Sequence, residues 1–396
     1  MELRRCAVLY LEPREQVGFD LGSLLAGGDG LRRSREWVAH APHLARPVGV
    51  DAGGFALLGA ASAEAWATCE ALSPGAPEAV GPLLDAGLLI AAAPVEQRHV
   101  LHADRDCRVR AGHWWPPAAM MHAAARWQGR DAAAATEAAG LATASGLREN
   151  LGVPPPAVPA RGGHGPPLAL ARAVATGNLD ELLRRRITCR NFDPHRPLPQ
   201  AALASMLERV FAAHGDWRAD EDTVFLKKTS PSGGGLHPTG AYLLVQRVEG
   251  VPAGLYHYHP VRHALEPLAP VAGPLDALAL RMVAGQHWFA EAPVLVVQAA
   301  RFARSFWKYR GHPKAYRALV MDAGHLSQTL YLAATDLGLG AFVTCAVNEV
   351  DIEQAFGLDP LEEGVMAVSG FGWPDPCRRN AEFDPQGQVW ADGRRR

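Results

Sequence analysis

The sequence has 396 residues, of which 48% are hydrophobic and 20% charged, a balance typical of a globular chain long enough for two or more domains. A net charge of −2 indicates no general attraction to nucleic acid or to a membrane surface. No apolar run reaches the roughly 20 residues that a bilayer requires. The six cysteines form no Cys-x-x-Cys pair, which argues against a zinc ribbon and a disulfide framework. We therefore expect a soluble, cytoplasmic protein.

Residues 1–112 are predicted to form a region similar to a winged helix. "SAEAWATCEALS", from Ser62, carries apolar residues at helical spacing. "AVGPLLDAGLLIAAA" predicts a helix, a cap at Gly87 and a short strand. DNA binding is not expected, because residues 55–97 contain no Lys or Arg to contact phosphates. Peptide binding and plain structural packing both stay open.

Residues 113–167 are predicted to combine a helical segment with a linker rich in Pro and Gly. The segment after Pro117 is rich in alanine at helical spacing. "GVPPPAVPARGGHGPP", residues 152–167, has no periodicity and is typical of an extended or mobile linker. Large apolar residues of the helical segment form either a stripe in the core, the commoner case, or a docking surface: Trp114, Trp115, Met120, Met121 and Trp127.

Residues 168–396 alternate between helical and strand patterns, which predicts an α+β domain with a mixed central sheet flanked by helices. Helices are expected at 168–176, 179–187, 199–213, 274–284 and 314–337. Strands are expected at 241–248, 254–259, 293–300, 341–347 and 365–371. The helix at 314–337 is apolar on most faces, so we expect it at the centre of the fold or at a subunit interface.

Two features of this domain point to an anionic ligand. Arginines cluster in "LLRRRITCRNF" and in "GFGWPDPCRRN", and guanidinium groups bind phosphate through paired hydrogen bonds. Solvated arginines at a helix end would give the same pattern. "SPSGGGLHP" places three glycines before a strand, where backbone amides can approach a ligand closely. These glycines fit neither a P-loop nor a dinucleotide-binding motif.

Four blocks in this domain resemble, in order, the motifs of the nitroreductase superfamily. They are Arg186-x-Thr188-x-Arg190-x-Phe192, Pro231-Ser232-Gly233-x-Gly235-x-His237-Pro238, the helical stretch 322–342 and the final "GFGWP". The stretch "VEGVPAGLYHYHPVRHALEPL" and the pair Lys308-Tyr309 are similar to one branch, the SagB-type peptide dehydrogenases. The resemblance implies a nitroreductase-like FMN domain at 168–396, preceded by a peptide-binding, winged-helix-like region at 1–112.

The resemblance also implies the residues that bind FMN. Arg186, with Arg378 or Arg379, would hold the phosphate, Arg190 would stabilise the reduced flavin, and the glycine loop would lie along the flavin ring. The implied cofactor-binding residues are Arg186, Thr188, Arg190, Pro231, Ser232, Gly233, Gly234, Gly235, His237, Gly370, Gly372, Arg378 and Arg379. No metal site is expected, because His257 and His259 have no carboxylate or cysteine at suitable local spacing.

The implied reaction is the oxidation of an azoline ring to an azole in a ribosomally made peptide. A base removes a proton from one ring carbon while a hydride leaves the neighbouring carbon for the flavin, and Lys308 or Tyr309 is the implied base. The implied partners are the peptide, a second copy in a homodimer and, where one is required, a cyclodehydratase or another maturation enzyme. Two alternatives stay open: an NAD(P)H-dependent reductase of nitro compounds or quinones, and a catalytically silent peptide-binding scaffold.

Overall fold

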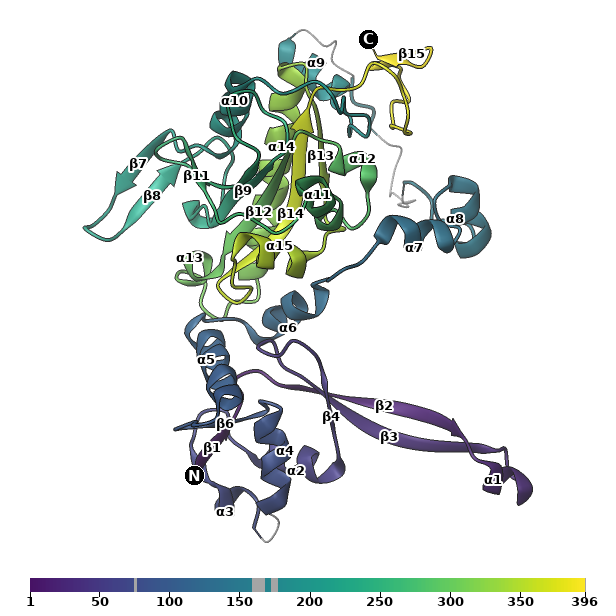
Figure 1. The fold of residues 1–396 in the computed structure, drawn as a ribbon, viewed down its shortest axis with the longest axis vertical. Helices are drawn as coiled ribbons and strands as arrows, with labels where there is room; N and C mark the ends of the chain where they lie inside the picture. The colour runs from purple at the N-terminus through teal and green to yellow at the C-terminus, as the bar shows by residue number, and fades with distance from the viewer. Residues whose placement is uncertain (75–76, 159–167, 172–176, 396) are drawn as a thin grey trace. The chain divides into compact units, whose positions relative to one another are not determined.

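The structure is a computed structural model that describes residues 1–74, 77–158, 168–171 and 177–395 (Figure 1). The chain splits into two compact units. Unit 1 comprises Met1–Arg126, Phe302–Arg317 and Asp359–Glu363, and unit 2 comprises Trp127–Arg301, Ala318–Leu358 and Gly364–Arg396. Unit 1 thus includes two segments from the C-terminal part of the chain. The domains predicted from the sequence, 1–112, 113–167 and 168–396, are continuous ranges, and that division stays a prediction.

Unit 2 is built around a six-stranded sheet in the order β11-β10-β9-β12-β14-β13 (Figure 1). Strand β9 pairs antiparallel with β10 and with β12, and β13 pairs antiparallel with β14 at one edge. The strands are β9 (Thr239–Val245), β10 (Gly254–His259), β11 (Ala264–Pro267), β12 (Val294–Arg301), β13 (Gly340–Thr344) and β14 (Glu363–Gly372).

Helices cover both faces of this sheet. Leu243 and Leu244 are successive residues of β9, so their side chains point to opposite faces, and both are fully buried. Leu243 packs with α10 (Gln200–Phe211) and α14 (Ala315–Asp336). Leu244 packs with α11 (Leu275–Met282), α12 (His287–Ala290) and α15 (Glu349–Phe356). The expected α+β architecture, a central sheet flanked by helices, is confirmed.

Unit 1 contains a three-stranded sheet in the order β5-β1-β6, formed by β1 (Glu2–Arg5), β5 (Ala67–Thr68) and β6 (Leu89–Ala91). Residues of this sheet share a core with α2 (Ala52–Ala60) and α4 (Val80–Asp85). Gly87 lies between α4 and β6 with a φ of 74°, as the helix-cap-strand pattern predicts. Nothing in these elements tests the winged-helix assignment, which stays a prediction.

The predicted helix from Ser62 is wrong over most of its length. The Ser62 hydroxyl accepts hydrogen bonds from the backbone N–H groups of Glu64 and Ala65, at 3.1 and 2.9 Å, and so closes a turn instead of capping a helix. Only the short α3 (Cys69–Leu72) follows, capped by the hydroxyl of Thr68. Ser and Thr favour turns and helix caps for the same reason, so local sequence does not separate the two outcomes.

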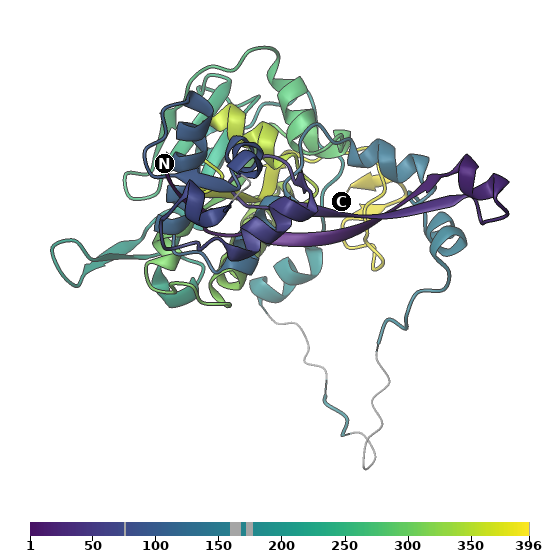
Figure 2. The ribbon, with the colours of Figure 1, turned by 90° about the horizontal axis from the view of Figure 1, so that it is seen from below.

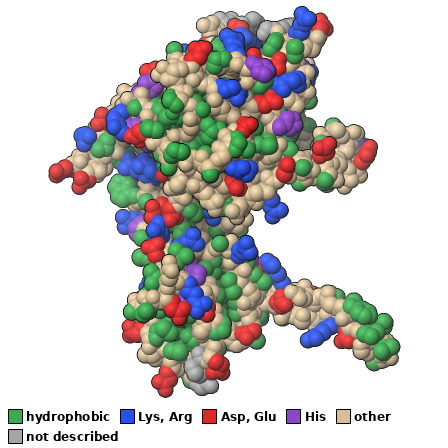
Figure 3. All heavy atoms as spheres, in the orientation of Figure 1, with side chains coloured by type: hydrophobic (Ala, Val, Ile, Leu, Met, Phe, Trp, Pro, Cys, Tyr) green, Lys and Arg blue, Asp and Glu red, His purple; other side chains and the backbone are tan. Residues whose placement is uncertain are grey.

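A long two-stranded arm in unit 1 was not predicted. Strands β2 (Tyr10–Phe19) and β3 (Leu31–His40) pair along their full length, and α1 (Leu21–Leu25) lies between them (Figures 1 and 2). A third strand, β4 (Val48–Val50), pairs with the base of β3. Apolar side chains gather at the tip of the arm, including Phe19 and Leu25, which are 72% and 80% exposed (Figure 3).

The remaining helices of unit 1 include α5 (Gln97–Ala111), α6 (Pro116–Ala125) and α13 (Phe302–Phe306). The five residues of the predicted apolar stripe do not share one environment. Trp114 is buried against Phe302 and Phe306 of α13, whereas Met121 is 54% exposed. The stripe is therefore neither a continuous core face nor a continuous surface.

In unit 2 most predicted elements exist, with ends that shift by a few residues. Helix α9 (Asn178–Arg185) replaces the range 179–187. Helices α6 and α7 (Ala132–Ala138) divide the alanine-rich segment, and α8 (Ala144–Leu151) follows it. The helix predicted at 168–176 is not formed at 168–171, and 172–176 lie outside the described residues. Five short strands among the described residues of unit 2 were missed: β11, β7 (Gly215–Arg218), β8 (Val224–Lys227), β15 (Trp390–Ala391) and β16 (Arg394–Arg395).

Candidate functional site

The loop at 230–237 precedes β9 and is fastened to helix α14. The hydroxyls of Ser230 and Thr329 share a hydrogen bond of 2.7 Å. The Ser232 hydroxyl donates to one carboxylate oxygen of Asp322 at 2.5 Å, and the Gly233 N–H donates to the other at 3.2 Å. Ser232 also accepts a hydrogen bond of 3.0 Å from the backbone N–H of His237. One helix therefore fixes both the start and the middle of the loop.

The three glycines of this loop have separate structural reasons. They form one 3-10 turn in which Gly234 and Gly235 have φ angles of 65° and 68°, the left-handed region that glycine favours. A Cβ atom on Gly233 would lie 3.1 Å from the Cβ of Ala318 on α14, so the close approach of loop and helix favours glycine here. A Cβ on Gly235 would meet no atom of the described residues within 4 Å, so they leave the space beside it open.

A small pocket opens between this loop, β9 and α14. Its lining contains three residues that the sequence placed at a cofactor, Pro231, Ser232 and His237. It also contains Lys228, Thr239, Asp322 and Leu326, for which the sequence gave no functional signal.

Two ionisable groups of the pocket, Asp322 and Lys228, are perturbed by burial. Burial raises the pKa of the Asp322 carboxyl, although the hydrogen bonds from Ser232 and Gly233 act in the opposite direction. Burial, with a smaller contribution from Arg301, lowers the pKa of Lys228 to about 8. Shifts of this kind are typical of functional sites, so the pocket is a candidate site on physical grounds.

The segment at 186–190 lies on the edge strand β13. The Cys189 N–H donates to the Ala341 carbonyl at 2.8 Å. The hydroxyl of Tyr331, on α14, accepts a hydrogen bond of 3.1 Å from the Val343 N–H and shares one of 3.0 Å with the Thr188 hydroxyl. Helix α14 therefore supports this segment as it supports the loop at 230–237.

Two arginines of this segment retain hydrogen-bond donors for a ligand. The Arg186 guanidinium lies 5.2 Å from the centre of the Tyr331 ring and pairs with no carboxylate among the described residues. The Arg190 guanidinium makes one long contact, 3.5 Å, to the Ala381 carbonyl and lies 5.9 Å from the Phe289 ring. Both side chains are half-buried. They can therefore offer charged donors to an anion.

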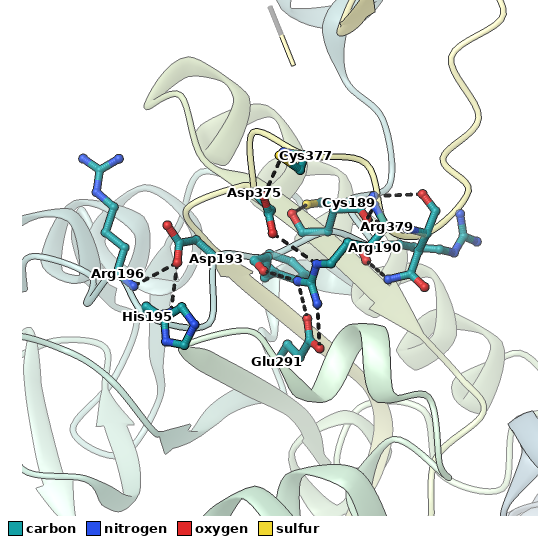
Figure 4. A network of polar contacts seen from close by, with 12 residues as sticks. Cys189, Arg190, Asp193, His195, Arg196, Glu291, Asp375, Cys377 and Arg379 are labelled. Atoms are coloured by element: carbon teal, nitrogen blue, oxygen red, sulfur yellow. Dashed lines mark hydrogen bonds and ion pairs between the residues drawn. The ribbon is translucent and has the colours of Figure 1, made fainter. Parts of the chain in front are cut away.

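The second arginine cluster is engaged in the fold (Figure 4). Arg379 donates to both carboxylate oxygens of Glu291, at 3.1 and 2.7 Å, to Asp375 at 3.1 Å and to the Phe192 carbonyl at 2.8 Å. These partners, Glu291 first, raise the pKa of Arg379 further above its ordinary value. Arg378 donates to the Glu382 carbonyl at 2.8 Å. Phosphate contact by either residue stays a prediction, and the contacts of Arg379 do not favour it.

Gly370 and Gly372 belong to the buried strand β14, where packing explains the absence of a side chain. A Cβ on Gly370 would overlap the Phe342 ring, and one on Gly372 would overlap Pro293. Their predicted contact with a cofactor stays a prediction, but the sheet requires small residues at both positions in any case.

Lys308 and Tyr309 lie in unit 1, in the turn after α13. The Lys308 side chain is exposed, and its ammonium lies 5.6 Å from the centre of the Tyr309 ring. The Tyr309 N–H donates to the Ser305 carbonyl at 3.2 Å, and the turn ends at Gly311, whose N–H donates to the His113 carbonyl. The turn is thus ordered by backbone contacts within unit 1, and the catalytic role of this pair stays a prediction.

Three relatives among known proteins share part of this chain. The trifolitoxin-processing protein TfxB of Rhizobium leguminosarum bv. trifolii is 34% identical over 145 residues, which are 36% of this chain and 39% of the relative. The microcin B17-processing protein McbC of Escherichia coli is 28% identical over 152 residues, 37% of this chain and 54% of the relative. The chain therefore spans about two fifths and about half of these two proteins.

The third relative is covered over most of its length. A protein of Methanocaldococcus jannaschii that is named as a nitroreductase is 32% identical over 178 residues, 44% of this chain and 82% of the relative. The family model described as "Nitroreductase family" matches residues 183–373. That range contains the segment at 186–190, the loop at 230–237, helix α14 and strand β14. The chain therefore belongs to the nitroreductase family.

Proposed function

We propose that this protein is an FMN-dependent dehydrogenase that oxidises a ribosomally made peptide during its maturation, converting an azoline ring to an azole. The observation that carries the proposal is the combination of a nitroreductase-family domain with two relatives named for the processing of trifolitoxin and microcin B17. The family supports an oxidoreductase, and the two relatives support a peptide as its substrate.

The residues of unit 2 fit an FMN molecule. Arg186 and Arg190 have charged donors that no carboxylate among the described residues occupies, which suits an anionic group such as the FMN phosphate. The loop at 230–237 has open space beside Gly235, which lets a planar ring approach the backbone. When bound, FMN would supply the acceptor for a hydride. The fit favours Arg186 over Arg379 as the phosphate ligand, because the donors of Arg379 are already used.

The protein itself must hold the peptide and move a proton. Oxidation of an azoline removes one C–H proton, so a basic side chain has to lie beside the ring. The resemblance gives this task to Lys308 or Tyr309. The exposed position of Lys308 is compatible with contact to a large substrate such as a peptide.

We also propose that the protein is a homodimer and that the peptide is its main partner. Helix α14 is buried on the sheet side but exposes Val320 and Met321, which are 53% and 56% accessible and lie next to Gly324. Exposed apolar residues on a central helix are typical of a subunit contact. Cooperation with another maturation enzyme, such as a cyclodehydratase, is part of the same proposal.

One alternative function is supported by a specific observation. It is an NAD(P)H-dependent reductase of nitro compounds or quinones. The relative covered over 82% of its length is named as a nitroreductase. Such an enzyme takes its electrons from a nicotinamide, whereas a peptide dehydrogenase takes them from its peptide.

The flavin spectrum separates these functions. The purified protein is first examined for a flavin absorption band, and NADPH or NADH is then added without oxygen. We expect a yellow protein whose band persists with nicotinamide and bleaches with an azoline-containing peptide. Rapid bleaching by nicotinamide would favour the reductase. If the protein is colourless and cannot be reconstituted with FMN, the catalytically silent peptide-binding scaffold would be the hypothesis that still fits.

A further inference from the structure

Lys228 lines the pocket beside the loop at 230–237, and the sequence analysis did not identify it as a site residue. Lys228 follows strand β8 directly, is 4% exposed and lines the pocket together with Ser232, His237 and Asp322. Its ammonium has no hydrogen-bond or ion-pair partner within the described part of the chain. A buried lysine without a counter-ion is costly, and the cost falls if the amine is neutral or if a ligand pairs with it.

The surroundings of Lys228 make its ammonium easier to deprotonate than that of an ordinary lysine. Burial is the larger cause of its lowered pKa, and the positive charge of Arg301 is the second. His237, Thr239 and Asp322 also line the pocket, and Asp322 directs both carboxylate oxygens to Ser232 and Gly233 of the loop. No carboxylate lies within ion-pair distance of the Lys228 ammonium among the described residues, so no opposite charge offsets the effect of burial on its pKa.

We propose that Lys228 is the catalytic base that accepts the substrate proton in the pocket beside the loop at 230–237. This inference rests on the proposed function. The C–H bond of one ring carbon breaks, the proton forms an N–H bond on the neutral Nζ atom, and Lys228 becomes an ammonium. The electron pair enters the new ring double bond as a hydride leaves the neighbouring carbon, and bound FMN would be the oxidant that accepts this hydride.

Lys228 suits this task better than Lys308 because the two side chains differ in environment. Lys308 is exposed and lies in unit 1, whereas Lys228 is buried beside the loop that the resemblance places along the flavin. An amine that titrates close to the working pH is the more efficient base. The neighbouring Lys227 is exposed and outside the pocket, and so provides a control of the same residue type one position away.

The first test measures titration of the amine without turnover. The FMN-loaded protein is acylated at a series of pH values, and the labelling rates of Lys228 and Lys227 are compared by peptide mass spectrometry. We expect the labelling rate of Lys228 to reach half of its plateau near pH 8, because its pKa is about 8. The exposed Lys227 reports how acylation itself varies with pH. A Lys228 labelling rate that follows the Lys227 rate at every pH would overturn the proposal.

The second test uses turnover. Lys228→Arg keeps a positive charge that cannot be removed at neutral pH, so it should lower peptide oxidation by roughly 10²–10⁴-fold. Lys228→Met, which suits a buried site, should show the same loss with an unchanged flavin spectrum. Lys227→Arg should retain the wild-type rate. The turnover of the wild type should fall below about pH 8, as the amine is protonated.

The outcomes distinguish this inference from the function on which it rests. If the wild type oxidises the peptide and Lys228→Arg does so at a similar rate, Lys228 is not the base and Lys308 or Tyr309 keeps that role. If the wild type oxidises no azoline peptide while nicotinamide bleaches its flavin, the proposed function fails, and the base assignment fails with it whatever the labelling shows.

Discussion

The arginines of unit 2 differ in the contacts that their guanidinium groups already make. These contacts indicate which arginine can bind an anion better than the number of arginines does. Arg379 has four hydrogen bonds to protein acceptors, so an arriving phosphate would have to displace them. Among the described residues, the Arg186 guanidinium contacts the Tyr331 ring and pairs with no carboxylate, so it keeps its donors. A charged group that is ordered but unpaired is a ready ligand for an anion.

Replacement of Arg186 by Ala should therefore weaken FMN binding with little effect on folding. A charge-assisted contact of this type contributes about 1.5–3 kcal/mol, which corresponds to roughly a 10- to 150-fold rise in the dissociation constant. Flavin titration followed by fluorescence would measure it. Arg185→Ala is the matched control, because Arg185 is exposed and pairs with Glu181 at the surface. Equal FMN affinity in the wild type and Arg186→Ala would remove Arg186 from the phosphate site.

His122 illustrates a buried residue with a structural effect on pH dependence. It lies in unit 1 between Tyr316, whose hydroxyl is 3.1 Å from Nδ1, and the Pro360 carbonyl, 3.0 Å from Nε2. Burial lowers its pKa to about 4, and the charge of Arg126 adds to the effect. The unfolded chain binds a proton near ~6.5, so stability falls as the pH drops from about 6.5 toward 4.

We predict that this single group lowers the stability of the protein by about 2 kcal/mol between pH 7 and pH 5. His122→Phe removes the titration, so its melting temperature should depend less on pH than that of the wild type. Thermal denaturation followed by circular dichroism at both pH values measures the difference. His195→Phe, at an exposed position, should keep the wild-type dependence. An unchanged pH dependence in His122→Phe would contradict the prediction.

Charges in the core are the residues that the sequence predicted least well. Lys227 and Lys228 are adjacent and chemically identical, yet one is exposed and the other is 4% exposed. Nothing in a single sequence distinguishes them, because burial depends on the distant residues of α14 and β12. Ser232 and Thr188, by contrast, were recognised through the motifs that contain them. The structure adds their partners on α14, Asp322 and Tyr331.

At the scale of elements, the sequence predicted buried strands better than exposed ones. Strands β9, β12 and β14 are buried on both faces and have continuous apolar sequences, so they were found. Strands β2 and β3 expose most of their residues, and charged side chains such as those of Arg14 and Glu36 alternate with few apolar ones. The period-2 signal is therefore weak in the arm, and its pairing comes from the backbone ladder.

The C-terminal segment depends on one buried carboxylate. Glu382 is 4% exposed and accepts hydrogen bonds from the Arg190 N–H at 2.6 Å, the Asn191 side-chain amide at 2.8 Å and the Trp390 indole at 2.7 Å. The Trp390 indole, the Arg190 N–H and the Asn191 side-chain amide thus all donate to the Glu382 carboxylate. This contact fastens strands β15 and β16 to the segment that carries Arg190.

Glu382→Ala should release the C-terminal segment, because each donor left unsatisfied costs about 1–3 kcal/mol. Hydrogen exchange by mass spectrometry should show faster exchange at 376–395 and at 190–191, with slow exchange retained in strand β12. Glu221→Ala, at an exposed position, is the control and should leave exchange in these segments unchanged. Unchanged exchange in Glu382→Ala would show that other contacts hold the segment.

At the scale of the whole molecule, helix α14 has two different faces, which correspond to the two alternatives considered from the sequence. Its inward residues, such as Leu330 and Ala334, pack on the sheet of unit 2. Its outward residues Val320, Met321 and Gly324 are exposed in the single chain. The two possibilities considered from the sequence, a central helix and an interface helix, are compatible, since one face can serve each purpose.

We predict that a second copy of the chain covers this outward face. Met321→Lys places a charge in the contact and should convert the dimer to a monomer, measured by size-exclusion chromatography with light scattering. Asp322, the next residue, positions Ser232, so loss of the dimer should also lower FMN occupancy. Val261→Lys, at a site 60% exposed in the β10–β11 turn, should leave the dimer intact. A monomeric wild type would refute the dimer, and a dimeric Met321→Lys would move the contact away from α14.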